Sequence, residues 1–212
     1  MSTEALIAKG RGRAYRVLSR LFLKEPDSAL LDLLLTGETG LLPGGSGAGF
    51  EGMVPGTADG TEAFLEVLAE EYAALFILPG GASPYESVRL KGLLCQEPEW
   101  KTREFYKKHG LTLSGEMNVF SDHVALEFDF MGCLAVRESA SWDSGDRAGA
   151  LVWRSVQAEF FREHLGRWVF DFIGEVERLS AHPFYMAAAR LSRAMMEFEP
   201  GHLSDSVQAS CQ

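Results

Sequence analysis

Apolar residues in this chain return at every third or fourth position along most of its length, and this spacing limits the folds open to it. The clearest stripe lies in residues 62–77 and consists of Phe64, Leu65, Leu68, Tyr72, Leu75 and Phe76. Such spacing lines one face of an α-helix with apolar side chains, whereas a half-buried β-strand alternates apolar and polar residues. No alternation longer than four residues is evident. The sequence therefore predicts an all-α fold.

Proline, glycine and capping residues separate the periodic stretches. On this basis we expect helices over residues 4–23, 28–36, 62–77, 98–109, 119–141, 145–164, 166–181 and 183–199. Residues 37–60 are rich in glycine and carry little periodicity, so we expect a flexible loop there. We assign residues 1–200 to a single compact helical domain and residues 201–212 to a polar C-terminal tail.

The 212 residues carry a net charge of −10, and the sequence pI is near 5.0. Nucleic acids and anionic membrane surfaces attract basic proteins, so this charge argues against both as partners. An acidic surface suits a cationic partner such as an arginine-bearing peptide. No segment has the apolar core of a signal peptide, and none approaches about 18 uninterrupted apolar residues. We therefore expect a cytoplasmic chain without stable membrane insertion.

Side chains that commonly bind metals or cofactors are scattered along the chain. The cysteines Cys95, Cys133 and Cys211 form no C-x-x-C pair, so neither a zinc site nor a redox motif is predicted. No paired Glu-x-x-His helix accompanies His123 and Glu127, and no G-x-S-x-G nucleophile elbow is present. We expect no metal, no cofactor and no catalytic residues.

The segment that begins at Tyr72 is unusual, because an amphipathic helix runs directly into a Pro-Gly-Gly-x-x-Pro loop. Proline and glycine end the helix, and Tyr85, Glu86 and Ser87 follow in a row. In a structural interpretation the ring of Tyr85 is buried and Glu86 accepts backbone N–H bonds. In a functional interpretation the loop forms one wall of a groove, where Glu86 binds a guanidinium through two parallel hydrogen bonds.

A second unusual segment, residues 121–131, places a histidine and three carboxylates inside an apolar helix. On a helical wheel His123 shares an arc with apolar residues, and Glu127 follows it at the i,i+4 spacing of a side-chain pair. A core histidine held by Glu127 or by a backbone carbonyl, with Asp122 as a helix cap, accounts for this pattern. A recognition site accounts for it as well, and both interpretations can hold together.

Together the two segments resemble the TorD/DmsD/NarJ family of cytoplasmic redox-enzyme maturation chaperones. The resemblance rests on Tyr72-x-x-Leu75-Phe76-x-x-Pro79-Gly80, on Pro84-Tyr85-Glu86-Ser87-Val88 and on Asp122-His123-x-x-Leu126-Glu127-x-x-Phe130-Met131. Supporting landmarks follow in the family's order at Tyr106 to Leu111, at His164-Leu165-x-x-Trp168 and at His182-Pro183-Phe184-Tyr185. One departure is Ser121, where many members have proline.

The resemblance implies an all-helical chaperone that is not an enzyme. It implies binding of the N-terminal signal peptide or the apo-form of a molybdenum-containing oxidoreductase, and help with its maturation, cofactor insertion or export. The partner is then a molybdoenzyme catalytic subunit or its leader peptide, and the chaperone is a monomer or homodimer. The expected peptide-binding residues are Tyr85, Glu86, Ser87, Asp122, His123 and Glu127. The alternatives are a helical hydrolase or nucleotide-binding protein that uses Asp122, His123 and Glu127, and a purely structural oligomerisation module.

Overall fold

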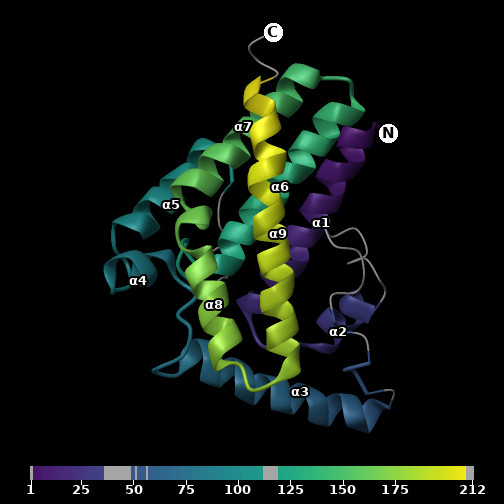
Figure 1. The fold of residues 1–212 in the computed structure, drawn as a ribbon, viewed down its shortest axis with the longest axis vertical. Coiled ribbons are helices and arrows are strands. Elements are labelled where there is room, and N and C mark those ends of the chain that lie inside the picture. Colours follow the sequence, from purple (N-terminus) through teal and green to yellow (C-terminus); the bar gives the residue numbers. More distant parts are fainter. Residues whose placement is uncertain (1, 36–48, 51, 56, 112–118, 209–212) are drawn as a thin grey trace.

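The computed structural model describes residues 2–35, 49–50, 52–55, 57–111 and 119–208 (Figure 1). Its α-helices are α1 (Thr3–Leu23), α2 (Ser28–Leu35), α3 (Ala58–Tyr72), α4 (Glu86–Lys91), α5 (Glu97–Lys108), α6 (Val124–Asp143), α7 (Arg147–Glu163), α8 (Val169–Leu179) and α9 (Pro183–Gln208). A π-helical turn, η2 (Ala73–Ile77), follows α3, and a 3-10 turn, η3 (Leu165–Arg167), joins α7 to α8. Within these ranges the only β-type pairing is one isolated bridge, so the predicted all-α fold is confirmed. None of the helices described is both long and apolar enough to cross a membrane.

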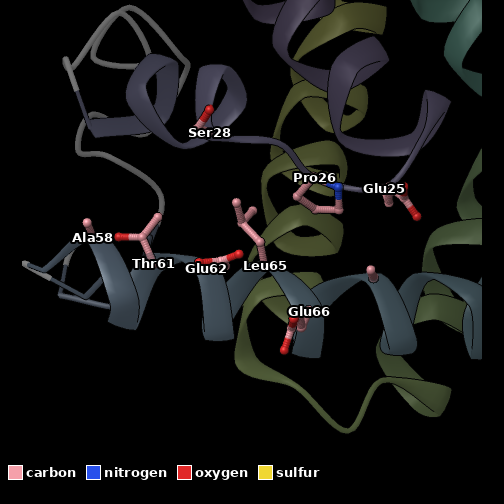
Figure 2. A pocket seen from close by; sticks show the side chains of 9 residues that line it. Glu25, Pro26, Ser28, Ala58, Thr61, Glu62, Leu65 and Glu66 are labelled. Carbon is pink, nitrogen blue, oxygen red and sulfur yellow. The ribbon is translucent and has the colours of Figure 1, made fainter.

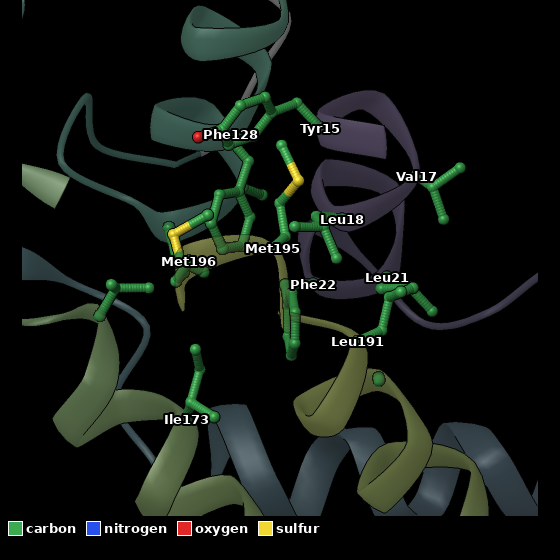
Figure 3. Packing of buried hydrophobic residues seen from close by; sticks show 14 of the residues in the cluster. Tyr15, Val17, Leu18, Leu21, Phe22, Phe128, Ile173, Leu191, Met195 and Met196 are labelled. Carbon is green, nitrogen blue, oxygen red and sulfur yellow. The ribbon is translucent and has the colours of Figure 1, made fainter. Parts of the chain in front are cut away.

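Helix α6 lies at the centre of the fold, packed along α1 and against α7, while α8 packs against α9. Figure 1 shows α9 running most of the length of the molecule, with α3 lying across the lower end of the view. Side chains from α1, α6, α8 and α9 meet in the core (Figure 3), and Phe22, Phe128, Ile173 and Met195 are among them. Aromatic rings fill much of this space. The ring centroids of Phe22 and Phe172 lie 5.3 Å apart in an edge-to-face contact.

Two glycines allow α1 and α6 to approach each other closely. A Cβ atom on Gly12 would lie 3.0 Å from Cγ2 of Val136, and one on Gly132 would lie 3.2 Å from Cβ of Tyr15. A side chain at either glycine would push the helices apart, because the separation of two packed helices follows the size of the residues between them.

A buried ionic network joins α1, α6, α7 and α9. Arg11 donates two hydrogen bonds to the carboxylate of Glu199, from Nε to Oε1 at 2.8 Å and from Nη2 to Oε2 at 2.7 Å. Arg11 also donates to Glu138 Oε2 at 3.1 Å and to Gln157 Oε1 at 2.7 Å, and Arg154 Nε donates to Glu138 Oε1 at 2.8 Å. Burial by itself lowers the pKa of Arg11, but Glu199 raises it above the usual range. The guanidinium therefore stays charged inside the protein.

The start of α3 differs from the prediction. The helix begins at Ala58 rather than at residue 62, because Thr57 caps it and accepts a backbone N–H from its first turn at 3.3 Å. The end of the glycine-rich stretch expected as a loop at 37–60 is therefore helical, and Phe50 within that stretch is buried in the core. The residues of this stretch and its border that lie outside the described part of the chain are 36–48, 51 and 56.

Helix α9 does not end near residue 199, where the sequence predicted its end. It continues through Pro200 to Gln208, and Leu203 beyond the proline is only 4% exposed. Proline usually breaks a helix by removing one hydrogen bond and crowding the preceding turn. Here the buried contacts on both sides of Pro200 offset that cost, so the predicted helix end is wrong. The division into a domain to residue 200 and a tail beyond it stays a prediction.

Replacing Arg11 by leucine should lower the free energy of unfolding by about 3–5 kcal/mol, because Glu199 is left buried without its ion-pair partner and Glu138 keeps only Arg154. Arg193→Leu is the control, since its ion pair with Glu177 is 34% and 31% exposed and exposed pairs contribute at most about 1 kcal/mol. Urea denaturation at neutral pH measures both variants. Equal losses in the two variants would contradict a special role for the buried network.

Replacing Leu203 by alanine should lower the free energy of unfolding by about 2–5 kcal/mol if the chain beyond residue 200 belongs to the core. The neighbouring exposed residue provides the control, Ser204→Ala, which should change stability little. Thermal and urea unfolding of both variants measure the difference. A Leu203→Ala variant as stable as the unmodified chain would instead support a C-terminal tail that starts at residue 201.

Candidate functional site

The loop after η2 is held in shape by its own backbone. Leu78 N donates to Ala73 O at 2.9 Å, which closes the π-turn, and Ala82 N donates to Leu75 O at 2.6 Å. A Cβ atom on Gly81 would overlap this same carbonyl oxygen, so only glycine fits at that position. Single π-turns are frequent beside functional sites. The Pro-Gly-Gly-x-x-Pro pattern thus folds the loop back onto the end of the preceding helix.

The loop then pairs with the segment that leads into α6. Val124 N donates to Pro84 O at 2.8 Å, and Glu86 N donates to Asp122 O at 3.0 Å. These two hydrogen bonds flank the isolated β-bridge between Tyr85 and His123. The two segments that the sequence singled out therefore form one unit, although they are far apart in the chain.

Two side chains of this unit cap the helices that leave it. Asp122 Oδ2 accepts the backbone N–H of Ser87 at 2.8 Å, in the first turn of α4. His123 Nδ1 accepts the backbone N–H of Ala125 at 3.1 Å and so caps α6. Each cap satisfies an N–H group that a helix start leaves without a partner. The sequence expected Asp122 to cap the helix that contains His123, but Asp122 caps α4 across the pairing instead.

His123 is almost completely buried, with 2% of its surface exposed. Its ring lies edge-to-face against Tyr85, with the ring centroids 4.9 Å apart. Burial lowers the pKa of His123 to about 3, because a charged imidazole would lose its hydration here. The histidine is therefore neutral at physiological pH and acts through its hydrogen bond and its packing.

The carboxylates of this region are also buried, and side chains from other helices hold them. Glu86 Oε2 accepts a hydrogen bond from Thr102 Oγ1 at 3.1 Å and lies 3.1 Å from Nδ1 of His164. Glu127 Oε2 accepts the indole N–H of Trp168 at 3.1 Å. The network thus ties the loop and α6 to α5 and to the segment between α7 and α8.

Burial and the nearby charge of Glu86 both affect the protonation of Glu127. Burial raises the pKa of Glu127 well above its usual value, and the charge of Glu86 raises it further. The second oxygens, Oε1 of Glu86 and Oε1 of Glu127, are buried and have no hydrogen-bond partner among the described residues. The raised pKa favours the protonated form of Glu127, and a proton there relieves the repulsion between the two carboxylates.

Apolar side chains at the surface lie beside this buried network. Tyr85 is half-buried, and its ring centroid lies 6.0 Å from that of Phe120, which is 41% exposed. Further exposed apolar side chains on the segments that flank the loop and α4 are Ile77, Leu78, Leu93, Leu94 and Trp100. Grouped apolar side chains at a surface often mark a binding site. We call the Tyr85 and Phe120 pair the aromatic rim.

A separate groove lies between the α1–α2 turn and α3 (Figure 2). Its volume is about 570 Å³, and the side chains of Glu25, Glu62 and Glu66 line it together with Pro26 and Leu65. None of the six predicted peptide-binding residues lines this groove. The predicted site therefore lies elsewhere on the molecule.

The structure brings the six predicted residues together, but it corrects two more of the expected contacts besides the cap formed by Asp122. His123 precedes α6, so the helical-wheel pairing with Glu127 is not formed among the described hydrogen bonds. Glu86 accepts from side chains rather than from backbone N–H groups. Sequence reasoning also left Thr102, His164 and Trp168 out of the site. The last two belong to a motif quoted for the resemblance, whereas a lone threonine inside a helix carries no signal.

An enzymatic role for Asp122, His123 and Glu127 finds no support in this arrangement. Each side chain bonds to a different group, and no side-chain hydrogen bond joins any two of the three within the described ranges. Catalysis by a base and a nucleophile requires the two to lie within hydrogen-bond reach of each other. The described residues also contain no group of three side chains that could hold a metal ion.

Comparison with known proteins identifies relatives along most of the chain. Residues 45–174 match the family model of the nitrate reductase delta subunit. A chaperone protein TorD from Vibrio vulnificus (strain YJ016) is 30% identical over 206 residues, which cover 91% of this chain and 94% of that protein. A chaperone protein TorD from Vibrio cholerae serotype O1 (strain ATCC 39315 / El Tor Inaba N16961) is 31% identical over 144 residues, or 66% of this chain and 64% of that protein. The match therefore spans less than two thirds of this second relative.

A solved structure shows the same fold. A proposed redox enzyme maturation protein from Archaeoglobus fulgidus superposes with a TM-score of 0.52 and 21% sequence identity, over 88% of this chain and 92% of that chain. The curated relatives carry the name of chaperones rather than of enzymes, which agrees with the expectation of a non-enzymatic protein.

The buried neutral histidine predicts a pH dependence of stability. The pKa of His123 is about 3 in the folded chain and about 6.5 when unfolded, so below pH 6.5 only the unfolded chain binds the proton. The contribution of His123 to the free energy of unfolding is complete above pH 6.5. As the pH falls from there toward 3, up to about 1.4 kcal/mol of this free energy is lost per pH unit. His123→Asn keeps a capping oxygen and removes this loss.

Urea denaturation of both proteins between pH 7 and 5 measures the difference. Asp122 and Glu127 have raised pKa values, so their contributions change in the opposite direction, but both proteins share them and they cancel in the comparison. Parallel pH profiles for the two proteins would mean that His123 takes up a proton in the folded state.

Proposed function

Because this chain belongs to the TorD/DmsD/NarJ family of redox-enzyme maturation chaperones, we propose that it binds the N-terminal signal peptide or the apo-form of a molybdenum-containing oxidoreductase subunit. Binding would assist maturation of that subunit, its cofactor insertion or its export. The proposal places the chain in the cytoplasm, where such a subunit folds, and it allows a monomer or a homodimer.

The aromatic rim is the observation that supports this proposal. An exposed Phe120 beside the half-buried Tyr85 offers a peptide an apolar contact, and aromatic side chains contribute much of the energy of protein interfaces. The rim stands on a loop that backbone pairing and buried caps hold in one conformation. A rigid surface loses little conformational entropy when a ligand binds.

The six predicted residues divide into two roles in this proposal. Tyr85 contacts the peptide, together with Phe120. The other five are buried beneath the rim, and they are Glu86, Ser87, Asp122, His123 and Glu127. A direct bond from Glu86 to a guanidinium would require the loop to open, because Glu86 is fully buried and bound to Thr102. We therefore assign arginine selectivity to the acidic surface of the chain rather than to Glu86 itself.

Replacing Phe120 by alanine should weaken peptide binding by about tenfold or more, because the variant removes an exposed aromatic contact. The melting temperature should change little, since Phe120 contributes little to the core. Isothermal titration calorimetry with synthetic N-terminal peptides of molybdoenzyme subunits from the same genome measures binding, with twin-arginine leaders and retained N-terminal segments as two separate sets. Val152→Ala removes another exposed apolar side chain, on α7, and is the matched control.

Asp122→Asn tests the supporting role of the buried residues. It should lower both binding and thermal stability, because Asp122 caps α4. Binding that survives Phe120→Ala and Tyr85→Ala together, in folded variants, would place the peptide site elsewhere. Failure of every molybdoenzyme peptide to bind the unmodified chain would remove the proposed function itself.

A further inference from the structure

A second groove lies between α1 and α6, away from the aromatic rim. Its volume is about 430 Å³. The residues that line it are Lys9, Gly12, Arg13 and Arg16 from α1 and Val136, Ser139, Ala140 and Asp143 from α6. Val136 lies 13 residues after His123, which corresponds to about 20 Å along the helix axis. A ligand in this groove would therefore leave the aromatic rim free.

The groove is basic, although the chain is acidic. The chain holds 30 acidic and 20 basic residues, yet three cations and one carboxylate line this groove. Lys9, Arg13 and Arg16 form no hydrogen bond or ion pair with any residue in the part of the chain that the structure describes. Arg16 acts at longer range on Asp129. Burial raises the pKa of Asp129, and the charge of Arg16 lowers it. Even with Asp129 counted as ionised, the cations are in excess.

The positions of the cations match the repeat of a helix. Lys9, Arg13 and Arg16 are four and three residues apart, so they share one face of α1 and span about 10 Å. Between the two helices the groove presents Gly12 and Ala140, which have little or no side chain to hold a ligand away. Val136 is 45% exposed and offers an apolar contact beside the charges.

We propose that this groove docks an acidic helical segment of a partner chain, with carboxylates spaced four and three residues apart. Such carboxylates have the same rise along a helix as the three cations, so all three pairs can form together. The small residues between α1 and α6 allow a third helix to pack closely, and Val136 meets its apolar side. This proposal does not depend on the leader-peptide site.

Extended polyanions fit this groove poorly. Nucleic acid and anionic membranes carry charge far beyond 10 Å, so they would also meet the acidic remainder of a chain with net charge −10. A short acidic helix confines its charge to the groove. The observations therefore favour a peptide over a duplex or a membrane.

The test uses the full chain and a fluorescein-labelled, alanine-rich helical peptide with three glutamates spaced four and three residues apart. Fluorescence anisotropy at low and at physiological salt measures binding. Arg13→Gln with Arg16→Gln should weaken binding about tenfold, because each exposed charge pair contributes up to about fivefold in affinity. Arg147→Gln with Arg190→Gln is the matched control, since it removes two exposed positive charges from other helices and should leave binding within about twofold. Circular dichroism verifies that both variants fold.

Three outcomes would overturn the proposal. The first is an equal loss in the control variant, which would mean that the peptide responds only to net charge. The second is equal binding of the same peptide with glutamines in place of glutamates. The third is a DNA duplex that binds through Arg13 and Arg16 when the glutamate peptide does not. Titration of Arg13→Gln with Arg16→Gln by leader peptides separates the two proposals, because this variant should leave leader binding unchanged.

Discussion

The arrangement of the long helices depends on the buried pairing of Arg11 with Glu199 and Glu138. A guanidinium removed from water needs partners with good geometry, and this one takes them from α9, α6 and, through Gln157, α7. All of these pairs form together only when the helices pack in the register that brings the groups into contact. Gly12, the next residue along α1, lets α1 and α6 approach at that register. Polar pairing selects the register, and small residues set the distance.

Once α6 is placed, its first residues determine the candidate site. The segment before Val124 pairs with the loop after Pro84, and each side supplies or receives a helix cap. The buried carboxylates do not face solvent, so their chemistry is structural. They fix the loop, and the loop positions Tyr85 beside Phe120. In the proposed function these buried residues would act on binding through the position of the loop.

Helix α6 carries two surfaces of different chemistry. The aromatic rim of Tyr85 and Phe120 lies near the start of α6, and the basic groove beside Val136 lies nearer its end. An apolar surface contributes mainly to affinity, whereas exposed charges contribute mainly to the rate and selectivity of association. If one flexible partner chain bound both surfaces, binding at the first would raise the effective concentration of its second segment at the other surface, and overall affinity would rise.

The sequence by itself determined the all-α class and the position of most helices, because apolar spacing and capping are local properties. Its two unusual segments also contained the residues that meet in the site. It could not place the partners of Glu86, since Thr102 and His164 lie 16 and 78 residues away and reach it only through packing. The sequence also placed His123 inside a helix, and this prediction was wrong. Pairing with the distant loop sets where α6 begins, and that pairing forms only in the folded chain. Tertiary structure alone decided which carboxylates are buried, and hence that the pKa of Glu127 is raised, because burial depends on the whole fold.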